Sequence, residues 1–256
     1  MDKIVIGILI PFIGTTFGSL IAFFIKDNLN LKIKKILLGF ASGIMVAASI
    51  WSLIIPAIEQ CESLGWFSWF PASFGLFLGF LFLILINCIN KFISKNKNKP
   101  NLKIKKKSLM VFSIIIHNIP EGMAVGVAMA AAYYGNSLLT MTMAIALSVG
   151  VAVQNIPEGA IVAIDLKMKG LSKTKSFLCG VLSGVVEPIF SIITFFITGI
   201  VSLVMPYILS FAAGCMLFVV ISEIIPEATE DLGTNFCSVG FVLGFIIMMI
   251  LDVSLG

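Results

Sequence analysis

Arginine is missing from this sequence, histidine occurs once, and charged residues of all kinds make up only 12% of its 256 positions. A soluble domain of this length needs a larger polar surface than that. The chain is instead 59% hydrophobic, and apolar stretches of about 20 residues, long enough to cross a bilayer as a helix, recur along it. We therefore expect an all-α polytopic membrane protein in which residues 1–256 form one transmembrane domain.

Eight apolar segments are long enough to span a membrane. We place them at residues 4–25, 35–58, 69–93, 108–134, 138–166, 177–200, 203–225 and 236–254. All 17 cationic side chains are lysines, and all but Lys3 fall at or between segments 1 and 2, 3 and 4, or 5 and 6. Because lysine-rich loops stay in the cytoplasm, we expect both termini outside a cell (inner or plasma) membrane.

The most lysine-rich stretch, at about 94–107, contains KNKNKPNLKIKKK and predicts a solvated cytoplasmic loop beside anionic lipid. The net charge of +4 therefore reports topology and gives no indication of nucleic-acid binding. The five cysteines show no spacing typical of zinc ligands, so small packing residues are the expected role. We expect a lipid environment, no cofactor and no enzymatic activity; a homodimer is compatible with the sequence.

The five residues NIPEG occur twice, as HNIPEG at 117–122 and QNIPEG at 154–159, near the middle of antiparallel predicted spans. In the first copy His117 and Glu121 are four residues apart and share one helical face; Gln154 and Glu158 repeat this spacing. Each proline also frees the carbonyl four residues earlier. Two antiparallel copies indicate an inverted repeat, a design that places binding sites at the membrane midplane.

Four glutamates fall inside predicted spans, where an ionisable side chain is costly and usually functional: Glu121, Glu158, Glu187 and Glu223. No arginine is available to neutralise them, so protons or a metal cation must do so. Imidazole, carboxylate and amide together favour a divalent transition metal. Protonated carboxylates in another kind of transporter stay open as the alternative. Ser183, Glu187 and Ser191 share a helical face, which indicates a water-accessible path.

The doubled motif, the eight spans and the long loop between spans 3 and 4 resemble the ZIP (Zrt-, Irt-like protein) family of metal transporters, in particular its prokaryotic branch. The resemblance covers essentially the whole chain and implies two adjacent metal positions. The first would use His117, Glu121, Gln154 and Glu158, with Met45 alongside. The second would use Asn118, Asn155 and Glu187, with Glu121 and Glu158 bridging the two positions.

The resemblance also implies a pathway. Ser52 would line the entry, and Glu223 would lie toward the exit. From the sequence itself we place Ser183 and Ser191 along the path and Asp165 toward the exit. Two departures bear on the chemistry. Asn155 stands where family members can have aspartate, and Ser222 stands where histidine is common. We expect uptake of Zn²⁺ toward the cytoplasm, with Fe²⁺, Mn²⁺, Co²⁺ and Cd²⁺ as other candidate ions.

Two other functions compete with metal transport as explanations of the buried glutamates. A proton-coupled carrier of a small organic solute could use the same glutamates as a relay. An intramembrane metalloenzyme would need the Glu-x-x-His pairs of di-iron bundles or an H-E-x-x-H sequence, and one histidine is too few for either.

Overall fold

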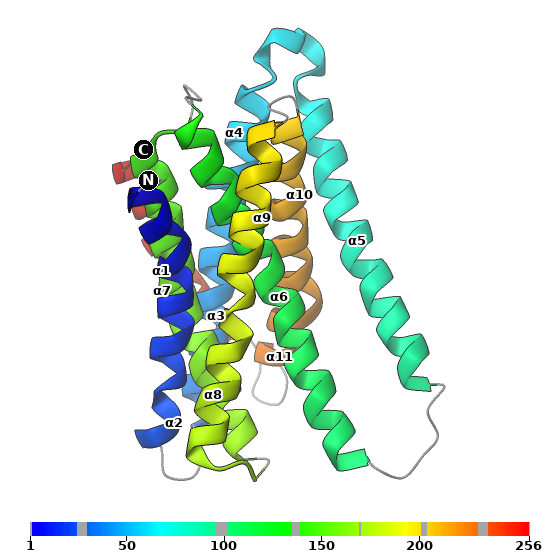
Figure 1. Ribbon diagram of the computed structural model, residues 1–256, viewed down its shortest axis with the longest axis vertical. Coiled ribbons are helices and arrows are strands. Elements are labelled where there is room, and N and C mark those ends of the chain that lie inside the picture. Colours follow the sequence, from blue (N-terminus) through cyan, green and yellow to red (C-terminus); the bar gives the residue numbers. More distant parts are fainter. Residues whose placement is uncertain are drawn as a thin grey trace.

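The computed structural model describes residues 2–24, 30–95, 102–134, 139–168, 170–200, 204–229 and 235–255. Within these ranges, nothing is described of the side chains of residues 90–95, 102–117, 165, 199, 200 and 255. All regular structure in the described ranges is helical, so the predicted all-α class is confirmed (Figure 1).

The elements are α1 (Asp2–Ser19), α2 (Ile21–Phe24), α3 (Leu31–Ala48), the π-helical η1 (Ser49–Ile54), α4 (Ile55–Glu59), the 3-10-helical η2 (Glu62–Phe67), α5 (Trp69–Lys95), α6 (Leu102–Tyr133), α7 (Met141–Met168), α8 (Lys173–Gly184), α9 (Val186–Ile200), α10 (Met205–Val219), the π-helical η4 (Val220–Ile224), α11 (Ile225–Thr229) and α12 (Asn235–Leu255). Several predicted spans are therefore built from two or three consecutive helical pieces.

Seven helical stretches of the described chain are long and apolar enough to cross a membrane, so the protein is a multi-pass helical membrane protein. The remaining predicted span, at 108–134, falls on α6, where the side chains up to His117 lie outside the description. Helix extends into the segment predicted as a loop at about 94–107, because α5 continues to Lys95 and α6 already begins at Leu102; the cytoplasmic location of this segment stays a prediction. Lysine and leucine are good helix formers, and nothing in this stretch after Pro100 stops a helix.

The helix ends next to the predicted lysine loops lie at one end of the bundle, and the first and last residues of the described chain lie at the other (Figure 1). The first helix begins and the last helix ends toward the upper end of the bundle in Figure 1, the end at which η2 also lies. The helix ends that flank the three predicted lysine loops lie at the opposite end, where α3 begins with Lys32, Lys34 and Lys35. The sequence prediction that these lysine-bearing ends share one side of the bundle agrees with this arrangement.

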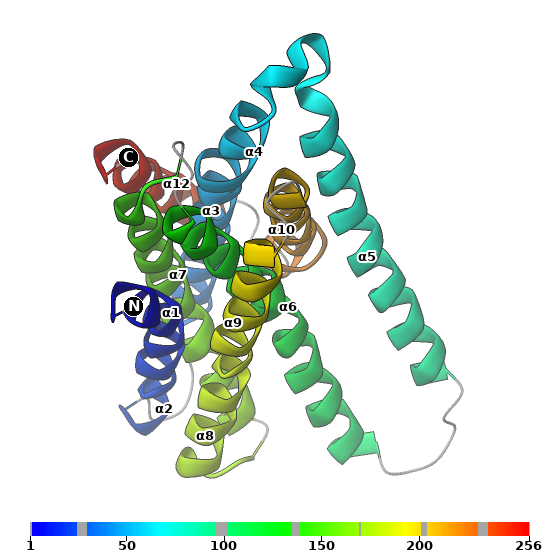
Figure 2. The ribbon, with the colours of Figure 1, turned by 45° about the horizontal axis from the view of Figure 1, so that its top comes forward.

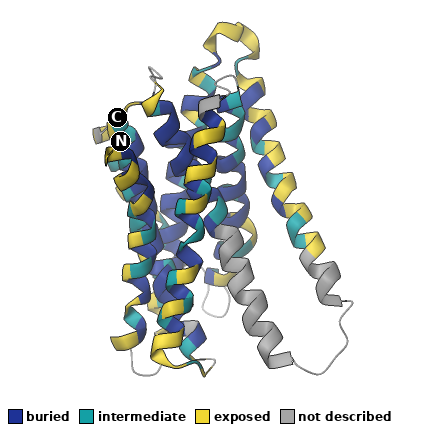
Figure 3. Ribbon diagram, viewed as in Figure 1, coloured by how far each residue is buried: buried dark blue, intermediate teal, exposed yellow. Residues whose placement is uncertain are grey.

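Buried residues are concentrated in the centre of the bundle, and the outer faces of α1, α5 and α9 are exposed (Figure 3). The exposed side chains there are large and apolar, including Phe17, Phe77 and Phe196, each at least 60% exposed. Water would penalise such surfaces, and hydrocarbon would not. The interior, by contrast, contains polar side chains from α6, α7 and α9, namely Asn118, Glu121, Gln154, Asn155 and Glu187.

Two π-helical segments interrupt the bundle near its opposite ends. Each precedes a proline in a similar sequence, SLIIP ending at Pro56 and SEIIP ending at Pro226. Proline cannot donate to the carbonyl four residues earlier and clashes with it, so a locally wider turn relieves both effects. These segments place Ser52 and Glu223 at the edges of the central core.

Glycines set which helices interlock through their backbones. A Cβ at Gly14 of α1 would overlap the backbone of Ala152 in α7, and one at Gly126 of α6 would overlap that of Ser191 in α9. A second set joins α3 to α12 and α5 to α10, where Gly43, for example, leaves no room for a Cβ beside Phe241. Figure 2 shows α5 and α10 as neighbours on one side, away from α1 and α7.

Candidate functional site

The two NIPEG motifs meet in the interior, because α6 and α7 pack against each other. Asn118 and Glu121 of the first motif and Gln154 and Asn155 of the second are all at most 3% exposed. Both helices continue through their prolines, Pro120 and Pro157 being internal to α6 and α7. The motifs therefore bring polar side chains from two continuous helices to one buried place.

An amide links the two motif carboxylates. Gln154 donates from Nε2 to Glu121 Oε1 at 2.6 Å and, in a longer contact of 3.4 Å, to Glu158 Oε1. Gln154 stands where the other motif has histidine. The first and second motifs are thus joined by hydrogen bonds through the residue that begins the second one.

Glu187 of α9 joins the same cluster. Its Oε1 accepts a hydrogen bond from Asn118 Nδ2 at 3.0 Å and another from Thr15 Oγ1 of α1 at 2.7 Å. The Asn155 amide lies close enough to Glu121 and Glu187 to interact with both carboxylates. Residues of α1, α6, α7 and α9 therefore form one polar cluster.

Several acceptor oxygens of this cluster have no donor. Ten buried side-chain polar atoms find no hydrogen-bond partner within the described part of the chain. Half of them belong to this cluster, and all five are oxygens: Asn118 Oδ1, Glu121 Oε2, Gln154 Oε1, Asn155 Oδ1 and Glu187 Oε2. An unsatisfied buried acceptor costs about 1–3 kcal/mol, so five in one place indicate a site that a cation would complete.

Carboxylates alone do not make a ready metal site. Among the described side chains, no three histidine, cysteine, aspartate or glutamate residues are placed to hold a metal ion together. His117 belongs to α6, and its side chain lies outside the description. The amide oxygens would therefore have to contribute, and oxygen-rich mixed sets of this kind accept divalent cations.

The remaining predicted site residues are less central. Met45 of α3 is fully buried in the apolar cluster, so its role as a ligand stays a prediction. Ser183 Oγ donates to Gly180 O at 2.7 Å and Ser191 Oγ donates to Gly122 O at 2.8 Å. Both serine hydroxyls thus bond to backbone, Ser183 within α8 and Ser191 across the contact between α9 and α6. These bonds give no evidence for the predicted water path. Asp165 lies in α7 with its side chain outside the description.

The predicted entry and exit residues each bond to a polar side chain of an adjacent helix. Ser52 Oγ donates to Asp252 Oδ1 of α12. Asn87 Nδ2 of α5 donates to Glu223 Oε1 at 3.4 Å. Both pairs lie outside the central cluster, on η1 and η4 respectively. The structure therefore separates these residues from the site and gives each a partner that the sequence analysis did not name.

Sequence reasoning missed Thr15, which contacts Glu187 directly. A signal was present, because Thr15 lies between Gly14 and Gly18 and four residues after Pro11 in a predicted span. Glycine marks a close helix approach in membranes, and a threonine on that face would meet the neighbouring helix. A threonine in an apolar helix is too common to be identified by composition alone.

Comparison with known proteins gives a family match. Residues 106–252 match a family model described as ZIP Zinc transporter. Zinc transporter ZIPB of Bordetella bronchiseptica is 31% identical over 98% of this chain and 81% of its own length. Zinc transporter ZIP11 of Homo sapiens is 30% identical over 86% of this chain and 87% of its own, and zinc transporter ZupT of Chlorobaculum parvum is 28% identical over 95% and 93%.

Proposed function

Because the chain belongs to the ZIP family of zinc transporters, we propose that it moves a divalent metal ion, Zn²⁺ first of all, through the cluster between α6, α7 and α9 and into the cytoplasm. The family consists of transporters, so the protein is not an enzyme, and the organic-solute alternative finds no support. The relatives' names refer to zinc, and zinc is therefore the first ion to test.

One observation supports this proposal above the others: five buried side-chain oxygens that have no donor within the described residues lie together in one cluster. Isolated buried carboxylates cost several kcal/mol each. A divalent ion would satisfy the oxygens and the charge together. We assign the ligand set to His117, Asn118, Glu121, Gln154, Asn155, Glu158 and Glu187, with Met45 alongside.

We also propose eight spans in two inverted halves. GLFLGF at 75–80 in α5 resembles GFVLGF at 240–245 in α12, and the polar residues Asn87 and Asp252 each follow the last glycine by eight positions. Each of these helices interlocks with a partner that ends in a π-helical segment before proline. The similarity between the two helix pairs supports an inverted arrangement, and the even number of spans places both termini on one side.

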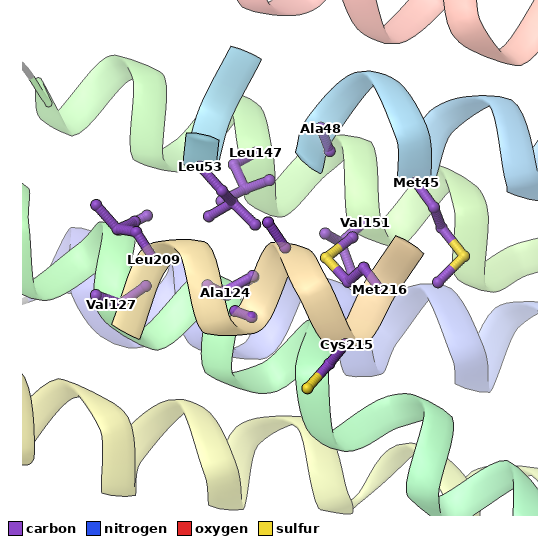
Figure 4. Packing of buried hydrophobic residues seen from close by; sticks show 14 of the residues in the cluster. Met45, Ala48, Leu53, Ala124, Val127, Leu147, Val151, Leu209, Cys215 and Met216 are labelled. Carbon is purple, nitrogen blue, oxygen red and sulfur yellow. The ribbon is translucent and has the colours of Figure 1, made fainter. Parts of the chain in front are cut away.

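The contacts between helix groups support alternating access. Glycine contacts join α1 to α7 and α6 to α9 through their backbones, and the hydrogen bonds of the polar cluster link these two pairs. The same helices meet α3 and α10 through apolar side chains such as Leu147, Leu209 and Met216 (Figure 4). Interlocked backbones resist sliding, and an interface made of apolar side chains resists it less. We propose that α1 and α6–α9 move as one body and carry the ion across.

The direct test is metal uptake into proteoliposomes that contain the purified protein. We expect saturable uptake of Zn²⁺ that Cd²⁺ competes for, and no uptake of Mg²⁺, which prefers octahedral oxygen ligands and dehydrates reluctantly. Measuring the uptake of a panel of divalent cations with and without a proton gradient identifies the driving force. Uptake no faster than into protein-free liposomes, for every transition metal of the panel, would refute the proposed function.

The proposed orientation predicts cysteine labelling. Burial raises the pKa of the Cys61 thiol, which is only 6% exposed, so the native residue would label slowly. Ser63→Cys in the exposed η2 segment of a cysteine-free variant is the better probe, and we expect an impermeant maleimide to label it in intact cells. Asn98→Cys, which lies outside the described residues, serves as the control and should label only after lysis. The opposite labelling pattern would mean that the proposed orientation is inverted, and with it the proposed direction of transport.

A further inference from the structure

The first and second motifs bind their neighbouring helices in the same way. Asn118 donates from Nδ2 to the backbone carbonyl of Ser183 at 3.1 Å, and Asn155 donates from Nδ2 to the backbone carbonyl of Pro11 at 3.5 Å. Four residues after Ser183 comes Glu187, and four residues after Pro11 comes Thr15. The two asparagines thus point to equivalent positions on α8–α9 and on α1.

The motif glycines give the same correspondence. A Cβ at Gly122 would overlap the carbonyl oxygen of Glu187, and a Cβ at Gly159 would overlap the carbonyl oxygen of Thr15. Each motif therefore uses its final glycine to approach the backbone four residues after the carbonyl that its asparagine bonds.

The correspondence continues one turn further along both helices. Ser191 Oγ donates to the carbonyl of Gly122 at 2.8 Å. Ser19 Oγ donates to the carbonyl of Thr15 at 2.8 Å and makes a longer contact of 3.4 Å with the carbonyl of Gly159. Positions 11, 15 and 19 of α1 thus match positions 183, 187 and 191 of α8–α9 in three independent contacts. Thr15 is the counterpart of Glu187.

This pairing completes the site. Positions 117 and 154, 118 and 155, and 121 and 158 pair through the two motifs, and positions 187 and 15 supply the fourth pair. Thr15 is 2% exposed, and its hydroxyl donates to Glu187 Oε1, the same oxygen that accepts from Asn118. Within the described residues Glu187 Oε2 has no donor. Two donors on one oxygen fix the carboxylate and leave the other oxygen directed to a ligand.

We propose that Thr15 is a positioning residue of the second metal position, in which its hydroxyl holds the Glu187 carboxylate with Oε2 presented to the ion. Thr15 also stands where a symmetric site would have a second carboxylate, and its neutral hydroxyl adds no charge. The inference rests on the proposed function, because it assumes that Glu187 binds the transported metal.

The test is a Zn²⁺ titration of the purified full-length protein against a competing chelator. The binding step that Glu187→Ala weakens identifies the second position. Thr15→Val keeps the side-chain shape and removes the donor, so we expect it to weaken that same step by about tenfold, as is usual when the partner of a metal ligand is lost. Thr15→Ser keeps the hydroxyl and should bind within about twofold of wild type, since the donated hydrogen bond is retained.

Two controls separate positioning from packing and from failure of the proposed function. Thr15→Ala removes the donor without adding a second methyl group, so it should match Thr15→Val if the hydroxyl is what matters. Equal binding by wild type and Thr15→Val would refute the role of Thr15 alone, as would a Thr15→Ser loss as large as that of Thr15→Val. Unchanged binding in Glu187→Ala would also refute it. Absence of any Zn²⁺ binding by the wild type would instead refute the proposed function.

Discussion

Glu121→Gln and Glu158→Gln should each abolish Zn²⁺ uptake, with rates at least about 100-fold below wild type. Each carboxylate would serve both metal positions, so one substitution damages both. Loss of a hydrogen-bond partner of a ligand already costs about 10–100-fold, and loss of the ligand itself should exceed that. Glu121 is fully buried and shares Gln154 with Glu158, so solvent cannot replace the lost oxygen ligand.

The measurement is initial uptake rate in proteoliposomes at equal protein content, with folding checked by size-exclusion chromatography. Asp2→Asn is a matched control, because it makes the same carboxylate-to-amide change on an exposed residue. It should transport at the wild-type rate. Rates near wild type for either glutamate variant would mean that the ion takes another route through the protein.

Asn155→Asp should raise the number of tightly bound metal ions from one toward two. Glu121, Glu158 and Glu187 supply three negative charges when ionised. One divalent ion leaves the cluster at −1, and two leave it at +1. Excess positive charge is expensive where water is scarce, since Coulomb energies there are several-fold larger than in bulk water. The native protein should therefore bind the first ion firmly and the second weakly.

A fourth carboxylate would balance two divalent ions. Asn155 lies near both Glu121 and Glu187, so an aspartate there would face the second position. Tighter binding should also slow release and lower the uptake rate. The measurement is metal content of both purified proteins by mass spectrometry, together with uptake. Two equally tight ions in the wild type, unchanged in Asn155→Asp, would show that charge does not set occupancy.

The sequence was most informative where a pattern repeats. The two copies of NIPEG predicted that Glu121 and Gln154, 33 residues apart, would come together, and their side chains do bond to each other. Long apolar stretches predicted the spans for a similar reason, because length and hydropathy are local properties. Helix termini were less accurate, as α6 shows by starting within a segment predicted as loop.

Contacts between segments far apart in the chain could not be predicted. Thr15 and Glu187 are separated by 172 positions, and nothing local to either residue identifies the other. The partners of Ser52 and Glu223 could not be predicted for the same reason, because Asp252 and Asn87 lie on other helices. Which side chains meet depends on helix packing through glycines, and that is a property of the tertiary structure.

The most direct test is a zinc-edge anomalous difference map from crystals of the protein grown with Zn²⁺. The strongest peak should lie within coordination distance of Glu121 and Glu158, between α6 and α7, and should be absent from crystals of Glu121→Gln. Zinc found only at surface carboxylates such as Glu59, Glu62 and Glu227, with the buried oxygens of the cluster unliganded, would contradict the assignment of the NIPEG motifs as the transport site.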